Sequence, residues 1–177
     1  QDILRVDAWV LGLCVYTTPE LDSRTTEDYI NEFGQEQVHW GGFINKLQDL
    51  DYAEIQRQCE IIAATKWKMS VRIERPFGMP GFDWKTYHEN PELPAALSPM
   101  KCMNPYVFAQ MQPNGDLAFC GSQPDYTFGN IRDSRFLECW NGERANKWRR
   151  FLNRRLFASC SRCWSLYEYS RFDSSKR

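Results

Sequence analysis

Four of the seven cysteines are spaced so that they could hold one metal centre. They form the pattern C-x17-C-x39-C-x2-C, which consists of Cys102, Cys120, Cys160 and Cys163. The last two make a C-x-x-C loop, in which two thiolates can bind one tetrahedral metal ion or two corners of a cluster. One such loop is a weak signal, but four thiolates complete a closed site. The sequence therefore predicts a four-cysteine metal centre.

Two kinds of metal centre fit such a ligand set. Zinc sites made of four cysteines usually present two C-x2-C pairs. Here only the second pair has that spacing, because 17 residues separate Cys102 from Cys120. This split favours an iron-sulfur cluster over zinc, and unligated thiols are the remaining alternative.

The other three cysteines are expected to be structural. Cys14 lies in an apolar run and Cys59 on an apolar helix face, where cysteine behaves as a small hydrophobe. Cys139 should also be buried in the protein core. It would be a metal ligand only if one of the four predicted cysteines is not a ligand. An odd number of cysteines in a chain of 177 residues argues against a disulfide framework and for a reducing compartment.

A tight hairpin must position Cys120. Residues 113–115 read Pro-Asn-Gly between two apolar runs, and a two-residue turn at Asn-Gly would pair Cys120 with Ala109. Cys102 would then lie about 23 Å away along a straight strand, at about 3.3 Å per residue. Residues 103–105 must therefore bend back toward the centre, and Asn and Pro are suitable bend residues.

The first half of the chain alternates between apolar runs and amphipathic segments. We expect a strand buried on both faces at 3–16, a helix at 19–33, a strand in 38–44, a helix at 52–65 and a strand at 68–74. This alternation predicts an α/β fold with parallel strands and right-handed crossovers, as in part of a β/α barrel or an open sheet. Three such strands leave open edges, so this half needs a partner half.

Prolines and glycines are dense between residues 76 and 101, which predicts a connecting segment with little regular structure. The expected domains are the later part of a partial barrel at 1–75, a linker at 76–101 and a cluster-binding domain at 102–177. The last domain should consist of the β-hairpin followed by a helix at about 135–152.

Composition restricts the partners. Apolar residues make up 42% and charged residues 25% of the chain, which is the composition of a globular protein. The net charge is -1, so no basic surface is expected to recruit nucleic acid. Neither a membrane-spanning run nor a secretion signal is recognisable, and we expect a cytoplasmic protein without a membrane partner.

The C-terminal half carries an ordered series of motifs around the four cysteines. The series consists of Cys102-x-x-Pro105, Gln112-Pro113-Asn114-Gly115-Asp116-Leu117-x-x-Cys120, Gly129-Asn130-Ile131, Cys139-Trp140-Asn141-Gly142, Arg149-Arg150 and Cys160-x-x-Cys163. Over residues 100–164 it resembles the SPASM/twitch C-terminal extension of radical SAM enzymes. The resemblance implies an auxiliary [4Fe-4S] cluster held by the four cysteines. The lack of further cysteines downstream implies the single-cluster twitch form.

Residues 3–75 are similar to the later strands and helices of the radical SAM barrel. The C-x3-C-x2-C loop that binds the first cluster of that family occurs nowhere in the sequence, so this chain should not cleave S-adenosylmethionine alone. The sequence starts at Gln1, close to an apolar run, and we expect something upstream. A missing N-terminal half or a partner chain would supply S-adenosylmethionine and a second [4Fe-4S] cluster.

The resemblance implies the C-terminal portion of an oxidoreductase or peptide-modifying enzyme. Four protein thiolates leave no iron open to a substrate, so the auxiliary cluster would support electron transfer during radical modification of a peptide or small molecule. The alternative is a stand-alone four-cysteine module, with iron and sulfide or with zinc, that serves electron transfer or interaction.

Other residue types give weaker predictions. Basic side chains near the cysteines could raise the potential of a cluster, although a surface position is the expectation for each of Lys101, Arg149, Arg150 and Arg162. If the first half is a barrel, substrate contacts come from the strand ends near Thr17, Gly42 and Arg75. Ordinary structural roles are expected for His39, His88, Trp40 and Trp164.

Overall fold

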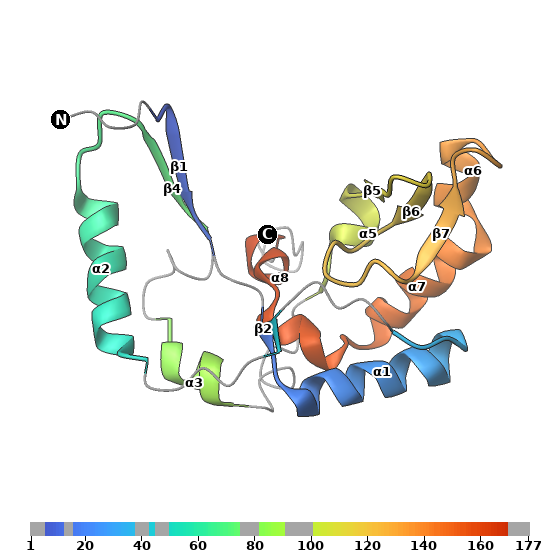
Figure 1. The fold of residues 1–177 in the computed structure, drawn as a ribbon, viewed down its shortest axis with the longest axis horizontal. Helices are drawn as coiled ribbons and strands as arrows, with labels where there is room; N and C mark the ends of the chain where they lie inside the picture. The colour runs from blue at the N-terminus through green and yellow to red at the C-terminus, as the bar shows by residue number, and fades with distance from the viewer. Residues whose placement is uncertain are drawn as a thin grey trace, which may run out of the picture.

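The computed structural model describes residues 6–12, 16–37, 43–44, 50–74, 82–90 and 101–169. Within these ranges the protein is a mixed α/β structure with two parallel strand pairs and one three-stranded antiparallel sheet (Figure 1). The described strands form no closed barrel. None of the described helices is long and apolar enough to cross a membrane.

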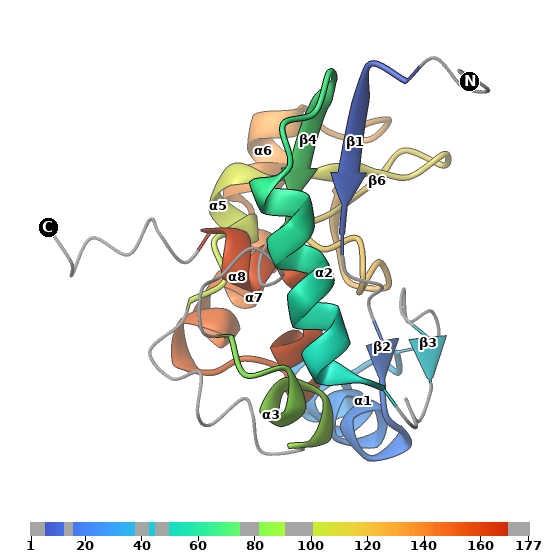
Figure 2. The same cartoon turned by 90° about the vertical axis from the view of Figure 1, so that its left-hand side faces the viewer.

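The strands of the first half pair in parallel, as predicted. Strand β1 (Ala8–Leu11) pairs with β4 (Ser70–Ile73), and β2 (Tyr16–Thr17) pairs with β3 (Phe43–Ile44). The prediction of one continuous strand at 3–16 is wrong, because β1 and β2 belong to different sheets. Figure 2 shows β1 and β4 at the top of the view, apart from β2 and β3, which lie below them.

The prediction that the first strand is buried on both faces is also wrong. The Trp9 side chain is 37% exposed and that of Val10 is 54% exposed. A ribbon of two strands has no further strand to cover it, so its apolar side chains stay accessible. Trp9 finds a partial cover in Trp67, whose ring meets it edge to face at a centroid distance of 5.8 Å.

Both long helices of the first half begin where their capping residues predict. Helix α1 (Pro19–Phe33) starts at Thr18, whose hydroxyl accepts a bond from the Leu21 amide at 3.3 Å. It ends at Gly34, whose φ of 69° is the left-handed conformation that glycine adopts without strain. Helix α2 (Tyr52–Ala64) starts at Asp51, which accepts from the Glu54 amide at 3.0 Å. These bounds confirm the predicted helices to within one residue.

The predicted linker contains a helix, which sequence reasoning missed because prolines are frequent on both sides of it. Helix α3 (Trp84–Glu89) lies in a stretch without proline or glycine, and Asp83 caps it by accepting from the Thr86 amide at 2.9 Å. Trp84 and Tyr87 are both buried, so the helix is anchored by its aromatic face. The expectation of little regular structure at 76–101 is therefore wrong at residues 84–89.

The second half is built on a short antiparallel sheet, which consists of β5 (Gln110–Met111), β6 (Asp116–Ala118) and β7 (Thr127–Asn130). The hairpin was predicted, but its turn has three residues rather than two. Gln110 pairs with Ala118, and the Gln112 amide donates to the Asp116 carbonyl at 2.8 Å. Gly115, with a φ of 92°, closes the loop in a conformation that fits a three-residue turn.

One helix precedes the sheet and several follow it, and two of these pack against β7. They are α5 (Asn104–Val107) before the hairpin, and then α6 (Phe136–Asn141) and α7 (Glu143–Arg154), which contact β7, the 3-10 helix η1 (Ala158–Arg162) and α8 (Trp164–Tyr169). The single helix predicted at 135–152 is wrong, because Gly142 adopts an extended backbone with a ψ of 169° and separates α6 from α7.

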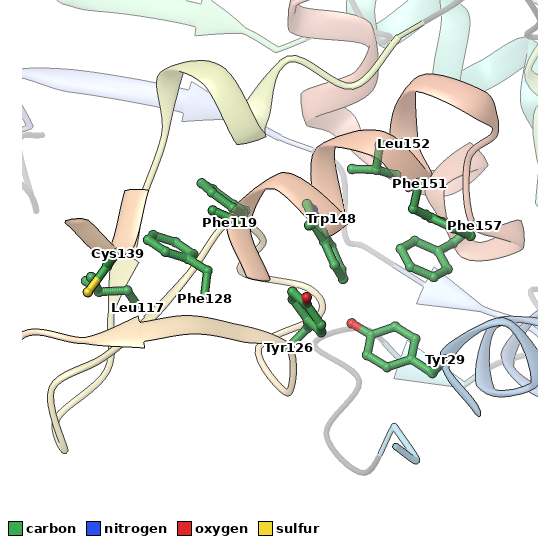
Figure 3. Close-up of a cluster of buried hydrophobic side chains, with 11 residues drawn as sticks. Tyr29, Leu117, Phe119, Tyr126, Phe128, Cys139, Trp148, Phe151, Leu152 and Phe157 are labelled. Carbon is green, nitrogen blue, oxygen red and sulfur yellow. The ribbon is translucent and has the colours of Figure 1, made fainter. Parts of the chain in front are cut away.

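An aromatic core joins the two halves of the chain (Figure 3). Tyr29 of α1 is fully buried in it, and its ring lies 5.1 Å from that of Phe157 and 6.0 Å from that of Trp148. The Thr25 hydroxyl accepts a buried bond from the Ser159 amide at 3.2 Å. Helix α1 therefore packs as part of the C-terminal core, although the sequence assigned it to the barrel half.

The close contact between β7 and α6 predicts that adding one methyl group at Gly129 strongly destabilises the fold. A Cβ on Gly129 would lie 2.5 Å from Sγ and 2.7 Å from Cβ of Cys139, which real structures do not tolerate. Gly129→Ala should lower the free energy of unfolding by about 1–3 kcal/mol, measured by urea denaturation. The control is Gly121→Ala, whose Cβ meets only the flexible end of Gln110 at 3.0 Å. Equal stability of both variants would contradict this packing.

Candidate metal centre

The four predicted cysteines line one pocket of the C-terminal half. Cys102 precedes α5 and Cys120 follows β6, while Cys160 lies in η1 and Cys163 directly after it. Three separate segments of the chain thus bring their sulfur atoms to the same cavity.

Local hydrogen bonds explain how each segment turns toward the pocket. The Tyr106 amide donates to the Met103 carbonyl at 2.9 Å, and this turn provides the bend that residues 103–105 were predicted to make. In the C-x-x-C loop the Cys163 amide donates to the Cys160 carbonyl at 3.0 Å. This bond holds the two sulfurs of the loop on one side of a single 3-10 turn.

The walls of the pocket are mostly aromatic and aliphatic. The apolar lining comes from Phe119, Trp148, Leu152, Phe157 and Leu166, and the polar lining from Asn104, Ser122, Gln123 and Ser159. A cavity of about 30 Å³ lies between these walls. In the part of the chain that the structure describes, no group of three His, Cys, Asp or Glu side chains is already arranged to hold a metal ion.

Burial keeps the thiols of this pocket protonated. Burial, and then the charge of Cys163, raises the pKa of Cys102 to about 12. The pKa values of Cys120 and Cys160 are raised by burial and then by the other thiols of the set, and burial also raises that of Cys163. Four thiolates can share such a pocket only if a cation compensates their charge. None of these thiols forms a disulfide.

The ligand set fits a metal cluster by its chemistry. Thiolates are the usual ligands of iron-sulfur clusters, and the enclosed apolar walls exclude the water that would compete for the metal. The position of Cys139 is consistent with a structural role. It is buried between β7 and α6, and it is absent from the lining of the pocket.

Of the four candidate basic residues, two lie where a surface charge was expected. Lys101 is exposed, and Arg150 is exposed and paired with Glu143. For Arg162, the next residue before Cys163, the expectation is wrong, since its side chain is only 1% exposed. It donates to the Asn90 carbonyl at 3.0 Å, which ties the C-x-x-C loop to the end of α3.

The remaining candidate, Arg149, is half-buried and joins α7 to the segment after Cys102. Its guanidinium donates to the Pro105 carbonyl at 3.0 Å and to the Trp140 carbonyl at 2.7 Å. It also lies 4.8 Å from the centre of the Trp140 ring. Arg149 thereby fixes α5, the turn that directs Cys102 into the pocket.

Several weaker candidates lie apart from this pocket or outside the described residues. Thr17 is fully buried, and His88 on α3 stacks on Tyr52 at a ring distance of 5.4 Å. Trp164 lines a second cavity of about 140 Å³, together with Cys120 and Cys163. The residues that lie outside the described ranges are Cys14, His39, Trp40, Gly42 and Arg75.

Sequence reasoning missed the polar atoms around the thiols. Trp148 Nε1 and Gln123 Oε1 are buried and have no hydrogen-bond partner among the described residues. Both residues line the pocket. The Tyr29 hydroxyl is also buried without a described partner, and the charges of Cys120 and Cys160 add to the burial that raises its pKa. No local motif marks these residues, because only the fold brings them to the cysteines.

A comparison with known protein families identifies the region of the pocket. Residues 102–164 match the SPASM family, described as an iron-sulfur cluster-binding domain. Such domains are typical of the C-terminal extensions of radical SAM enzymes. The match includes all four pocket cysteines and ends before most of α8. Neither the curated proteins nor the solved structures gave a match.

Proposed function

We propose that this chain, whose residues 102–164 are a SPASM iron-sulfur cluster-binding domain, holds one auxiliary [4Fe-4S] cluster through Cys102, Cys120, Cys160 and Cys163. The observation that supports this most strongly is the convergence of these four thiols, from three separate segments, on one apolar pocket inside that domain.

The role of the bound group follows from its ligand count. When bound, the cluster would accept and release single electrons. Four protein thiolates occupy every corner, so a substrate has no iron to coordinate. The protein contributes apolar walls, through Phe119, Phe157 and Leu166, that exclude water and keep electrostatic interactions strong. We infer that the domain relays electrons during radical modification of a peptide or a small molecule.

The first half supports the same context. The parallel pairing of β2 with β3 across α1 is one β-α-β unit of the kind that a β/α barrel contains, whereas β4 pairs with β1 rather than with β3. We propose that residues 1–75 are the later part of a partial barrel. The loop that binds the first cluster and S-adenosylmethionine would then come from an additional N-terminal segment or from a partner chain.

Anaerobic metal analysis tests the centre directly. Reconstitution of the 177-residue chain with iron and sulfide should give a brown protein with about four irons and four sulfides per chain. The broad visible absorption should weaken on reduction. A colourless protein that retains one zinc per chain would instead support the alternative, a zinc-stabilised interaction module. Protein without any bound metal would overturn both proposals.

A further inference from the structure

The pocket contains hydrogen-bonding groups that the protein itself leaves unused. An indole N–H can only donate, and the Trp148 side chain is 2% exposed with no described acceptor for its N–H. A buried donor without an acceptor destabilises the folded protein. Gln123, which is 3% exposed, has the opposite deficit, because its Oε1 is a buried acceptor without a described donor.

We propose that Trp148 and Gln123 donate hydrogen bonds to sulfur atoms of the bound cluster and raise its reduction potential. This inference rests on the proposed function, since it needs a cluster in the pocket. Both residues line that pocket together with the four cysteines. Sulfides and thiolates of the cluster are anionic acceptors, so they would satisfy the Trp148 N–H, a donor that otherwise has no described partner.

The Gln123 amide requires one further step. Its Nε2 lies 2.8 Å from the Ser159 hydroxyl, while its Oε1 faces no described partner. An amide oxygen would repel an anionic cluster, whereas rotation of the amide by 180° exchanges its two ends. In the rotated form Oε1 accepts from the Ser159 hydroxyl and Nε2 donates to the cluster. Loading of the cluster would therefore fix the amide in the rotated form.

The effect on the potential follows from charge. The reduced cluster carries one more negative charge than the oxidised one, so a donor stabilises the reduced form more. Removing one donor should thus disfavour reduction. We expect about a tenfold change in the ratio of reduced to oxidised cluster at a fixed potential, which is about 59 mV for one electron.

Trp148→Phe tests the first donor, because phenylalanine keeps an aromatic ring and loses the N–H. Gln123→Leu tests the second. Both variants should bind four irons and shift the potential, measured by EPR-monitored titration, to more negative values. Tyr126→Phe is the matched control. Its ring stacks on Trp148 at 4.9 Å and its hydroxyl donates to the Arg144 carbonyl at 2.8 Å, so it disturbs the same core without removing a pocket donor. The control should keep the wild-type potential.

A measurement on the unaltered sequence keeps the proposal testable if a variant loses its cluster. Protein labelled with 15N in the tryptophan indoles should show a 15N coupling to the reduced cluster in pulsed EPR. Wild-type potentials in both loaded variants, or no such coupling in the labelled protein, would overturn the inference. The proposed function fails separately, if the reconstituted chain contains no iron and sulfide.

Discussion

Replacing any one of Cys102, Cys120, Cys160 or Cys163 by serine is expected to remove most of the bound iron and sulfide. A serine hydroxyl remains protonated near neutral pH and is a poor ligand for iron, so three thiolates would have to hold the cluster alone. Mutation of a residue that only hydrogen-bonds to a metal ligand already reduces the affinity for the metal about 10- to 100-fold. Loss of a ligand itself should have a larger effect. We therefore expect the iron content per chain, measured after gel filtration under anaerobic conditions, to fall more than tenfold.

Cys139→Ser is the matched control for this series. The residue lies in the same domain and is buried, but the structure places it between β7 and α6 and away from the lining of the pocket. This variant should keep its full iron content and lose only a modest amount of stability. Loss of the cluster from Cys139→Ser together with its retention in Cys102→Ser would overturn the proposed ligand set.

The sequence predicted local elements best where the signals were local. Thr18 and Gly34 mark the ends of α1, and Asp51 marks the start of α2, because a cap acts on amides within the same turn. The errors came from tertiary context. Gly142 was read as part of one helix, although the chain changes direction there to place α7 against β7. Likewise, nothing local predicts that the single apolar run at 3–16 divides between two sheets.

For the site, the sequence supplied the thiols but not their surroundings. Spacing suggested four ligands because a C-x-x-C loop together with two further cysteines completes a closed four-thiolate site. The pocket that contains them also depends on Trp148 in α7 and Gln123 after β6, whose residue types are ordinary anywhere. Burial of Arg162 was equally unpredictable, since it results from the packing of α3 against the C-x-x-C loop. These are long-range contacts, which no motif encodes.

The metal-free protein should lose stability as the pH rises above about 9. A folded-state pKa of about 12 for Cys102, against the ordinary 9.0, means that the folded form keeps this proton in a range where the unfolded chain releases it. The contribution is fully present below about pH 9 and is lost progressively toward pH 12. For Cys102 it corresponds to about 4 kcal/mol, since each pKa unit is about 1.4 kcal/mol.

Urea unfolding of the metal-free protein between about pH 8 and 11 measures this loss. The pKa values of Cys120, Cys160 and Cys163 are raised in the same direction, so these thiols contribute to the same decline. A variant with alanine at all four positions provides the control. Its free energy of unfolding still depends on pH, but only through lysines, tyrosines and the other cysteines. Equal slopes in the two proteins would contradict neutral, buried thiols in the folded metal-free state.

The same protons give the loaded protein the opposite pH dependence. Binding of a metal centre requires thiolates, so each ligand releases its proton and the affinity rises with pH. Removal of iron by a chelator should therefore be faster at pH 6 than at pH 8, while the metal-free chain unfolds more easily at high pH. Near neutral pH the protonated thiols carry no charge, so the metal-free pocket has no repulsion between thiolates to overcome. A chelation rate independent of pH, at equal initial loading, would show that thiolate protonation does not control release.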